Sequence, residues 1–274
     1  MPISRKILPI WPRYCAKIPK PIKVNINNRY FCQPDWPVAK VLAFNTSRLH
    51  PLKDEPLVAP YGNFNLGAHV GDDIAKVEDN RRLLKQFLPE SSQIQWLEQV
   101  HGNTVAEVLR HNEHPLVADA AITRNPEITL AVMTADCLPV LLTCAEGREV
   151  AAVHAGWRPL QAGIIAGTLE KMHSPNKGLY AWLGPCISER AFEVGAEVRQ
   201  AFVEQDAMFD VAFKPSGQGK YLGNLPLIAR LQLSSLGVKH IHAVDHCTYA
   251  MQQRYYSYRR DGTTGRMAAL ITRL

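Results

Sequence analysis

The stretch Thr129–Arg158 constrains the fold of this 274-residue chain more than any other. It consists mainly of three short apolar runs, at roughly 128–134, 139–144 and 149–154, which are separated by two sharp breaks. Such runs predict strands. Asp136 and Cys137 occupy the first break, and His154 to Arg158 close the last run. Because polar residues at strand ends lie where a ligand can reach them, we expect a reactive site in this stretch.

The rest of the chain predicts a single α/β or α+β domain, a layered sandwich with mixed β-sheet flanked by helices. No internal repeat or low-complexity linker divides residues 30–274. The short gaps between the central runs favour some antiparallel pairing. Further strands are expected at 38–46, 94–98, 103–109, 179–183, 240–244 and 267–274. Helices are expected at 73–88, 159–172, 188–204 and 224–236, and Asp72 or Asp73 can cap the first of them.

The basic charge of the chain is concentrated at its N-terminus. The formal net charge is +6, yet residues 1–34 hold seven of the 31 basic side chains and no acidic one. The remaining 24 basic and 25 acidic residues give a net charge of −1. We therefore interpret residues 1–30 as a basic, proline-rich and flexible extension, and residues 31–274 as one catalytic domain. A balanced domain argues against a nucleic-acid groove.

The lack of a recognisable membrane span or secretory signal, together with the cysteine spacing, indicates an intracellular protein. No apolar run of about 18 residues could span a membrane, and no apolar segment of a secretory signal follows the N-terminal charges. The six cysteines lie far apart without the rhythm of a disulfide framework. They are typical of free thiols in a reducing cytoplasm. We expect a cytoplasmic monomer or homodimer that binds neither membrane nor nucleic acid.

Three side chains in turns or at strand ends form a candidate metal site: His101, Cys137 and His154. Two imidazoles and a thiolate suit Zn²⁺, and three protein ligands leave a fourth position for water. Such a site can generate hydroxide or polarise a substrate oxygen. Alternatively, Cys137 is a nucleophile with His154 as its base, as in cysteine hydrolases. The residues taken singly are also compatible with surface or capping histidines and a buried thiol.

Eight motifs in order resemble the YfiH family, from about Trp36 to the C-terminus. Its members have been called laccase-like multicopper polyphenol oxidases, purine nucleoside phosphorylases and peptidoglycan editing factors. The set is specific because all eight occur in order. They are WLEQVHG (96–102), ADAAIT (118–123), VMTADCLPVLL (132–142), AAVHAGWR (151–158), WLGPCIS (182–188), FEVG (192–195), CTY (247–249) and YSYRRDGTTGRMA (256–268).

The resemblance implies that His101, Cys137 and His154 bind a metal, Zn²⁺ or alternatively copper. It also implies phosphorolysis of adenosine and inosine, with adenosine deamination and methylthioadenosine cleavage as side reactions. A zinc-bound hydroxide can attack C6 of adenine. The substrates would then be a small nucleoside and phosphate.

Phosphate needs cationic or N–H donors, and the candidates are Arg158, Arg259 and Arg260. Arg158 follows His154 at a predicted helix start, where backbone amides also favour an anion. His69, in the shared motif GAHVGD, is a candidate acid/base or extra ligand, and Asp136 can orient a ligand or cap a turn.

Three other functions stay open: a cytoplasmic hydrolase that edits peptidoglycan precursors, a copper-dependent polyphenol oxidase, and a metal-binding protein without enzymatic activity. A multicopper oxidase normally needs paired H-x-H motifs, and only His240-Ile241-His242 matches here. The chain departs from the family pattern at 47–50, at Pro159, and at Asn224 and His246. The last two replace a carboxylate and a guanidinium, so they bear on substrate preference.

Overall fold

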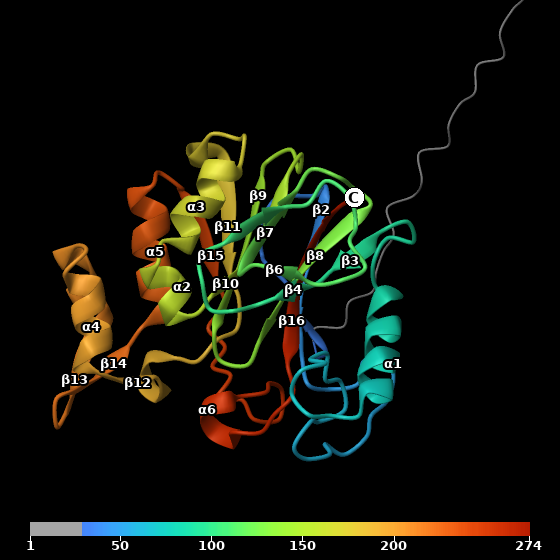
Figure 1. Ribbon diagram of the computed structural model, residues 1–274, viewed down its shortest axis with the longest axis horizontal. Coiled ribbons are helices and arrows are strands. Elements are labelled where there is room, and N and C mark those ends of the chain that lie inside the picture. Colours follow the sequence, from blue (N-terminus) through green and yellow to red (C-terminus); the bar gives the residue numbers. More distant parts are fainter. Residues whose placement is uncertain (1–28) are drawn as a thin grey trace, which may run out of the picture.

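The computed structural model describes residues 29–274. Two β-sheets face each other, and helices cover their outer faces (Figure 1). This α/β/β/α sandwich confirms the predicted mixed fold. The interpretation of residues 1–30 as a flexible extension stays a prediction, because residues 1–28 lie outside the described part of the chain. Across residues 29–274, no helix is long and apolar enough to cross a membrane.

The first sheet has five strands in the order β1-β2-β16-β8-β3. Its central strand is the C-terminal one, β16, which pairs antiparallel with β2 and with β8, while β3 runs parallel to β8. The apolar C-terminal run was predicted as a strand, and its central place explains why it is buried almost to its end. The bounds are β1 Phe31–Cys32, β2 Val41–Thr46, β3 Gln93–Gln95, β8 Ile128–Thr134 and β16 Met267–Arg273.

The second sheet has six strands in the order β15-β11-β9-β10-β7-β5. Strands β9 and β10 form the antiparallel pair that the short gap predicted. Strand β8 does not join them, because the chain crosses from one sheet to the other between Thr134 and Leu138. The bounds are β5 Val105–Glu107, β7 Ala120–Thr123, β9 Leu138–Cys144, β10 Val150–Ala155, β11 Leu179–Leu183 and β15 His240–Ala243.

The three central strands are buried on both faces, which is why they appear as continuous apolar runs. Leu130 and Val132 of β8 meet Leu141 of β9 and Ala152 of β10 in a core between the sheets. The alternate residues of β9 and β10 pack outward against helices α3 Ile164–Lys171 and α5 Leu225–Ser235. The outer face of the first sheet packs against α1 Ile74–Lys85.

Two predicted helices are shorter than expected. The helix predicted at 159–172 is two helices, α2 Trp157–Gln161 and α3, because Gly163 between them has a left-handed φ of 84°. The helix predicted at 188–204 was wrong over its first half. A 3₁₀ turn at Glu189–Ala191 and strand β12 Glu193–Gly195 precede α4 Ala196–Val203, since β12 pairs with β14 Lys220–Gly223.

The remaining elements are short. The expected strand 94–98 is two strands in different sheets, β3 and then β4 Leu97–Glu98, which pairs with β6 Leu116–Val117. Strand β13 Phe213–Gly217 completes the small sheet with β14. Two further 3₁₀ turns span Asn176–Gly178 and Ala207–Ala212, and α6 spans Tyr258–Asp261. The N-cap of α1 is Asp73, whose side chain accepts a hydrogen bond from the Ala75 amide at 3.0 Å.

Candidate metal centre

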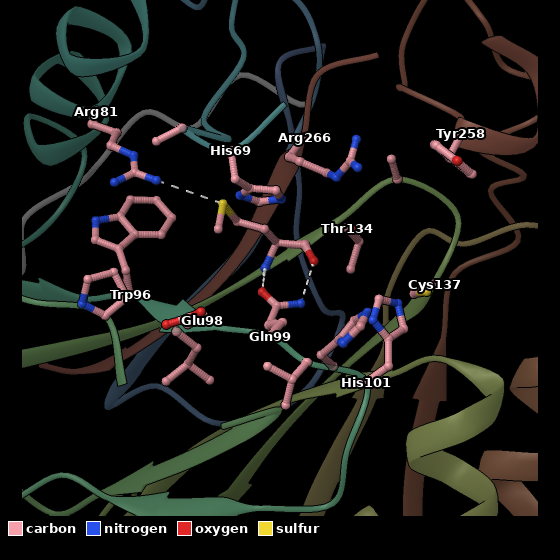
Figure 2. Close-up of a pocket in the computed structure, with 17 residues that line it drawn as sticks. His69, Arg81, Trp96, Glu98, Gln99, His101, Thr134, Cys137, Tyr258 and Arg266 are labelled. Atoms are coloured by element: carbon pink, nitrogen blue, oxygen red, sulfur yellow. Dashed lines mark hydrogen bonds between the residues drawn. The ribbon is translucent and has the colours of Figure 1, made fainter. Parts of the chain in front are cut away.

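The structure brings His101, Cys137 and His154 together. His101 lies in the turn between β4 and β5, Cys137 ends the crossing between the two sheets, and His154 lies near the end of β10. One ligand atom from each of the three lies within 4.8 Å of the others. The two imidazole rings meet edge to face with centroids 4.9 Å apart. Figure 2 shows His101 beside Cys137 at the edge of a cavity.

A buried carboxylate, Asp119, joins two of these ligands. Its Oδ1 lies 2.8 Å from His154 Nδ1 and accepts from the His101 amide at 3.0 Å. Its Oδ2 accepts from the amides of Val100 and Gly102. With its Nδ1 bonded to Asp119, His154 can offer Nε2 as a ligand atom. Burial alone would raise the pKa of Asp119, but the bonds from His154, Gly102 and His101 hold it below its ordinary value.

A second buried carboxylate, Asp136, fixes the backbone before Cys137. It accepts hydrogen bonds from Thr248 Oγ1 at 2.6 Å, Ser257 Oγ at 2.9 Å and the Arg259 amide at 2.7 Å. The Asp136 carbonyl accepts from the Ile187 amide. Asp136 therefore fastens the Cys137 turn to the C-terminal loop, the segment 246–266. The sequence left two roles open for Asp136, orienting a ligand or capping a turn, and these bonds join the turn to a distant loop.

Backbone strain and close packing are concentrated at the site. His101 has a φ of 59° and Asp136 a φ of 99°, values that residues with a side chain seldom adopt. Such conformations persist where surrounding contacts hold them. Here Asp119 accepts a hydrogen bond from the His101 amide, and the Asp136 carboxylate accepts three from the C-terminal loop. Gly156 leaves room for the thiol, because a Cβ there would lie 3.0 Å from Cys137 Sγ.

The electrostatics favour an ionised pair. Burial raises the pKa of the Cys137 thiol, but the neighbouring His154 and His101 imidazoles outweigh that effect and lower it to about 6. Burial lowers the pKa of His154, and the opposing influence of Cys137 and Asp119 raises it to about 9. A thiolate is the form of cysteine that binds metals and acts as a nucleophile.

The donor set fits a divalent metal of intermediate softness. Two imidazole nitrogens and one thiolate sulfur converge, and a carboxylate orients one imidazole from behind, as in many metal sites. The group contains no fourth His, Cys, Asp or Glu among residues 29–274. Three protein ligands beside a cavity are typical of a catalytic rather than a closed structural site.

The trio opens into a cavity of about 780 Å³. This volume is ample for a small-molecule ligand. Its walls come from the segment after β2, from α1, from the β4 region and from the C-terminal loop. The lining residues are Ala68, His69, Arg81, Trp96, Leu97, Glu98, Gln99, Val100, His101, Pro115, Met133, Thr134, Ala135, Cys137, His154, Tyr258 and Arg266.

One wall of this cavity is cationic. Arg81 and Arg266 lie on either side of His69 in Figure 2. Burial and these two cations lower the pKa of His69, which favours its neutral imidazole. Arg81 stacks on the Trp96 ring at 4.1 Å and donates to the Leu66 carbonyl. Arg266 Nη1 donates to the carbonyls of Thr264 and Gly265. Both guanidiniums are therefore held in place.

The three arginines expected to bind phosphate are not among the residues that line this cavity. Arg158 stacks on the Trp157 ring at 4.3 Å, in a helix of only five residues. Arg259 Nη1 donates to the carbonyls of Ala191 and Glu193. Arg260 donates to the carbonyls of Thr248, Tyr249 and Tyr255 and pairs with Asp261. The contacts of Arg259 and Arg260 hold loops together, and the sequence pattern does not predict them.

The departures from the family pattern at Asn224 and His246 also lie outside the cavity lining. Asn224 caps α5 by accepting from the Leu227 amide, and it donates to Glu189. His246 Nδ1 lies 2.8 Å from the Tyr255 hydroxyl. Neither of these two side chains therefore contacts a ligand in the cavity directly.

The sequence reasoning missed Asp119 as a ligand-orienting group, and Arg81 and Arg266 as the cationic wall. Asp119 is the second residue of the shared motif ADAAIT, and Arg266 lies in the last motif, so position within the motifs could have pointed to both. Arg81 had no such signal. Arg81 lines the cavity because of the way α1 packs on the first sheet, and that packing cannot be predicted from the local sequence.

Comparisons with known proteins agree with this fold and site. Residues 54–274 match the family model for "Multi-copper polyphenol oxidoreductase laccase". "Purine nucleoside phosphorylase YfiH" of Shigella flexneri is 45% identical over 239 residues, 87% of this chain and 96% of that protein. The relative of the same description in Escherichia coli K12 is 44% identical over the same shares.

Solved structures superimpose over most of the chain. A protein from Neisseria meningitidis has a TM-score of 0.84 at 39% identity, covering 89% of this chain and 99% of that one. YlmD from Geobacillus stearothermophilus has a TM-score of 0.79 at 28% identity, with the same coverage. With the family model spanning most of the described residues and these relatives matching nearly end to end, this chain belongs to the YfiH family.

Proposed function

We propose that this chain is a zinc-dependent purine nucleoside phosphorylase, with inosine and adenosine as substrates. The observation that carries the proposal is a three-ligand metal centre that opens into a cavity with a cationic wall. The relatives named purine nucleoside phosphorylase support it. Adenosine deamination and methylthioadenosine phosphorolysis are proposed as side activities of the same site. The free thiols of the described residues support the proposal of a cytoplasmic location.

In the proposed reaction, a phosphate oxygen bonds to C1′ of the ribose as the bond from C1′ to the purine breaks. The products are ribose 1-phosphate and the base, which takes up one proton. Arg81 and Arg266 would bind and orient the phosphate, because fixed guanidiniums match oxyanion geometry. The proton comes from the attacking phosphate: neutral His69, between the two arginines, would accept it and pass it to the leaving purine. His101, Cys137 and His154 would hold Zn²⁺, which when bound supplies a Lewis acid for a substrate or water oxygen.

Two of the other functions, a metal-binding protein without activity and a multicopper oxidase, receive less support. A non-enzymatic metal protein would bury the three ligands with a fourth and leave no cavity. The structure instead has three ligands beside an open space. A multicopper oxidase needs several metal sites, and the described residues contain one cluster of three or more ligands. His240 and His242 instead stack on Tyr180.

The test is phosphorolysis by purified, zinc-loaded protein with inosine and phosphate. We expect hypoxanthine and ribose 1-phosphate in equal amounts. Arg81→Gln should raise the KM for phosphate about tenfold or more, because it removes a charge-assisted contact. Arg158→Gln is the matched control and should leave that KM unchanged. Absence of hypoxanthine from metal-replete protein, beside an active phosphorylase standard, would overturn the proposal.

A further inference from the structure

A second cavity, of about 680 Å³, lies against the C-terminal loop, away from the metal centre. Its lining residues are Arg48, Pro56, Leu57, Ala59 and Pro60 and, from the C-terminal loop, Gln252, Gln253, Arg260, Asp261 and Thr263. None of these residues lines the first cavity. The volume lies in the range of small-molecule sites. We call this space the Arg48 cavity.

Arg48 is a buried cation with unsatisfied hydrogen-bonding capacity. Only 9% of the residue is exposed. Its Nη1 donates to the Gln252 carbonyl at 2.9 Å, and the guanidinium lies 5.0 Å from the centre of the Tyr256 ring. Its Nε is buried and has no hydrogen-bond partner among residues 29–274. Burial lowers the pKa of Arg48, yet a guanidinium stays protonated. A buried charge of this kind calls for a counter-ion.

The one acidic side chain that lines the Arg48 cavity is already paired. Asp261 accepts from Arg260 Nε at 2.8 Å and from Arg260 Nη2 at 2.7 Å. Arg260 also lines the cavity, so the lining has two guanidiniums and one carboxylate. Its net charge of +1 is that of Arg48. The amide side chains of Gln252 and Gln253 add neutral hydrogen-bonding groups beside it.

We propose that the Arg48 cavity binds an oxyanion of the phosphate type, with Arg48 as its anchor. A guanidinium suits the oxygens of a phosphate group, and a buried one attracts them more strongly than one in water. Arg260 contributes positive potential while its own bonds stay with the loop. The space exceeds what one inorganic ion fills, so the group can be free phosphate or the phosphate of a mononucleotide.

This second site adjoins the loop that supports the metal centre. Thr248 and Ser257 of the C-terminal loop hold Asp136, while Tyr258 and Arg266 line the first cavity. Residues between them face the Arg48 cavity. An anion bound there would therefore brace the segment that carries parts of the first site.

The experiment is calorimetric titration of the full-length, metal-loaded chain with inorganic phosphate and, separately, with adenosine monophosphate. All proteins carry Arg81→Gln to weaken binding in the first cavity. We expect at least one probe to bind. Adding Arg48→Gln should weaken that binding about tenfold to a hundredfold, because a charge-assisted contact is lost. If only inorganic phosphate binds, the cavity is a site for the free ion. If only adenosine monophosphate binds, it is a site for the phosphate group of a nucleotide.

A second variant covers the event that Arg48→Gln fails to fold. Gln253→Glu keeps Arg48 and places a carboxylate at the cavity. This negative charge should repel the anion and weaken its binding at least tenfold. It should also raise the Tm of the ligand-free protein, because it supplies a counter-charge for Arg48. Lys53→Gln, an exposed cation nearby in sequence, is the control that should change nothing. If neither probe binds, or if Gln253→Glu and any folded Arg48→Gln bind as tightly as the parent, the proposal is wrong.

Discussion

Asp119 does more to assemble the metal centre than any residue outside the ligand trio. It bonds to the His154 ring and to three consecutive amides that shape the His101 turn. The two ligands come from turns and strands 53 positions apart in the sequence. A single buried carboxylate thus sets the position of one ligand and the backbone of the other.

Replacing Asp119 by Asn should lower metal affinity about tenfold to a hundredfold, because the oriented and charged support of His154 is lost. The measurement is competition for Zn²⁺ with a chromophoric chelator. Asp73→Asn changes a carboxylate that caps α1 through the Ala75 amide and is not bonded to the trio, and it should leave the affinity unchanged. Equal affinities in wild type and Asp119→Asn would show that this carboxylate does not support the ligand.

At the residue scale, the sequence predicted the ligand trio but not its surroundings. His101, Cys137 and His154 stand out because reactive residues at strand ends are uncommon and chemically coherent. The arginines could not be assigned, because whether a guanidinium faces a cavity or a carbonyl depends on distant loops. Arg260 meets three carbonyls of its own loop, whereas Arg81 faces the cavity from a helix.

At the scale of elements, Glu149 connects the β9–β10 hairpin to the segment after α3. The buried Glu149 carboxylate accepts from the amides of His173 and Ser174 and pairs with Arg124 at 3.1 Å. Burial raises the pKa of Glu149, but the bonds from Ser174 and His173 and the charge of Arg124 hold it below the ordinary 4.5. This contact fixes the start of β10, whose other end carries His154.

Glu149→Gln should therefore destabilise the fold by about 1.5 to 3 kcal/mol at neutral pH, because a buried charged acceptor is lost. Since the folded pKa is depressed, the carboxylate contributes fully above about pH 4.5 and progressively less as the pH falls through the folded pKa. Urea unfolding at several pH values measures this. A gap between variant and wild type that stays constant from pH 7 to pH 3 would contradict the account.

The strands were easier to predict than the helices. β8, β9, β10 and β16 are apolar on both faces, so their runs are visible without knowledge of the partner strands. Their distribution over two sheets cannot be predicted in this way, because a gap of three residues, such as that between β8 and β9, can connect either a hairpin or two different sheets. The helix expected at 188–204 failed since pairing of β12 with β14 overrides local helical spacing.

At the scale of the whole molecule, the candidate metal centre lies where the two sheets meet. Cys137 follows a strand of the first sheet, and His154 belongs to the second. A bound metal would therefore connect the two layers as well as supply chemistry. Ligands that bind only the folded state stabilise it according to their concentration and affinity.

Removal of metal should lower the Tm by several degrees. The loss is about 4 kcal/mol where free metal exceeds its Kd a thousandfold. Scanning calorimetry with and without a strong chelator measures the change, and added Zn²⁺ should restore it. Cys137→Ser, which weakens the site, should make the Tm nearly insensitive to the chelator. An identical chelator response in wild type and Cys137→Ser would contradict a role for this site.

The left-handed backbone of His101 has a consequence for how the protein would evolve in the laboratory. A side chain at a φ of 59° costs on the order of 1 kcal/mol relative to glycine, which adopts that conformation freely. The imidazole is exposed, so its removal leaves no cavity in the core. A selection for heat resistance without metal should thus favour His101→Gly. The more heat-stable variants would then be ones that lack a metal ligand.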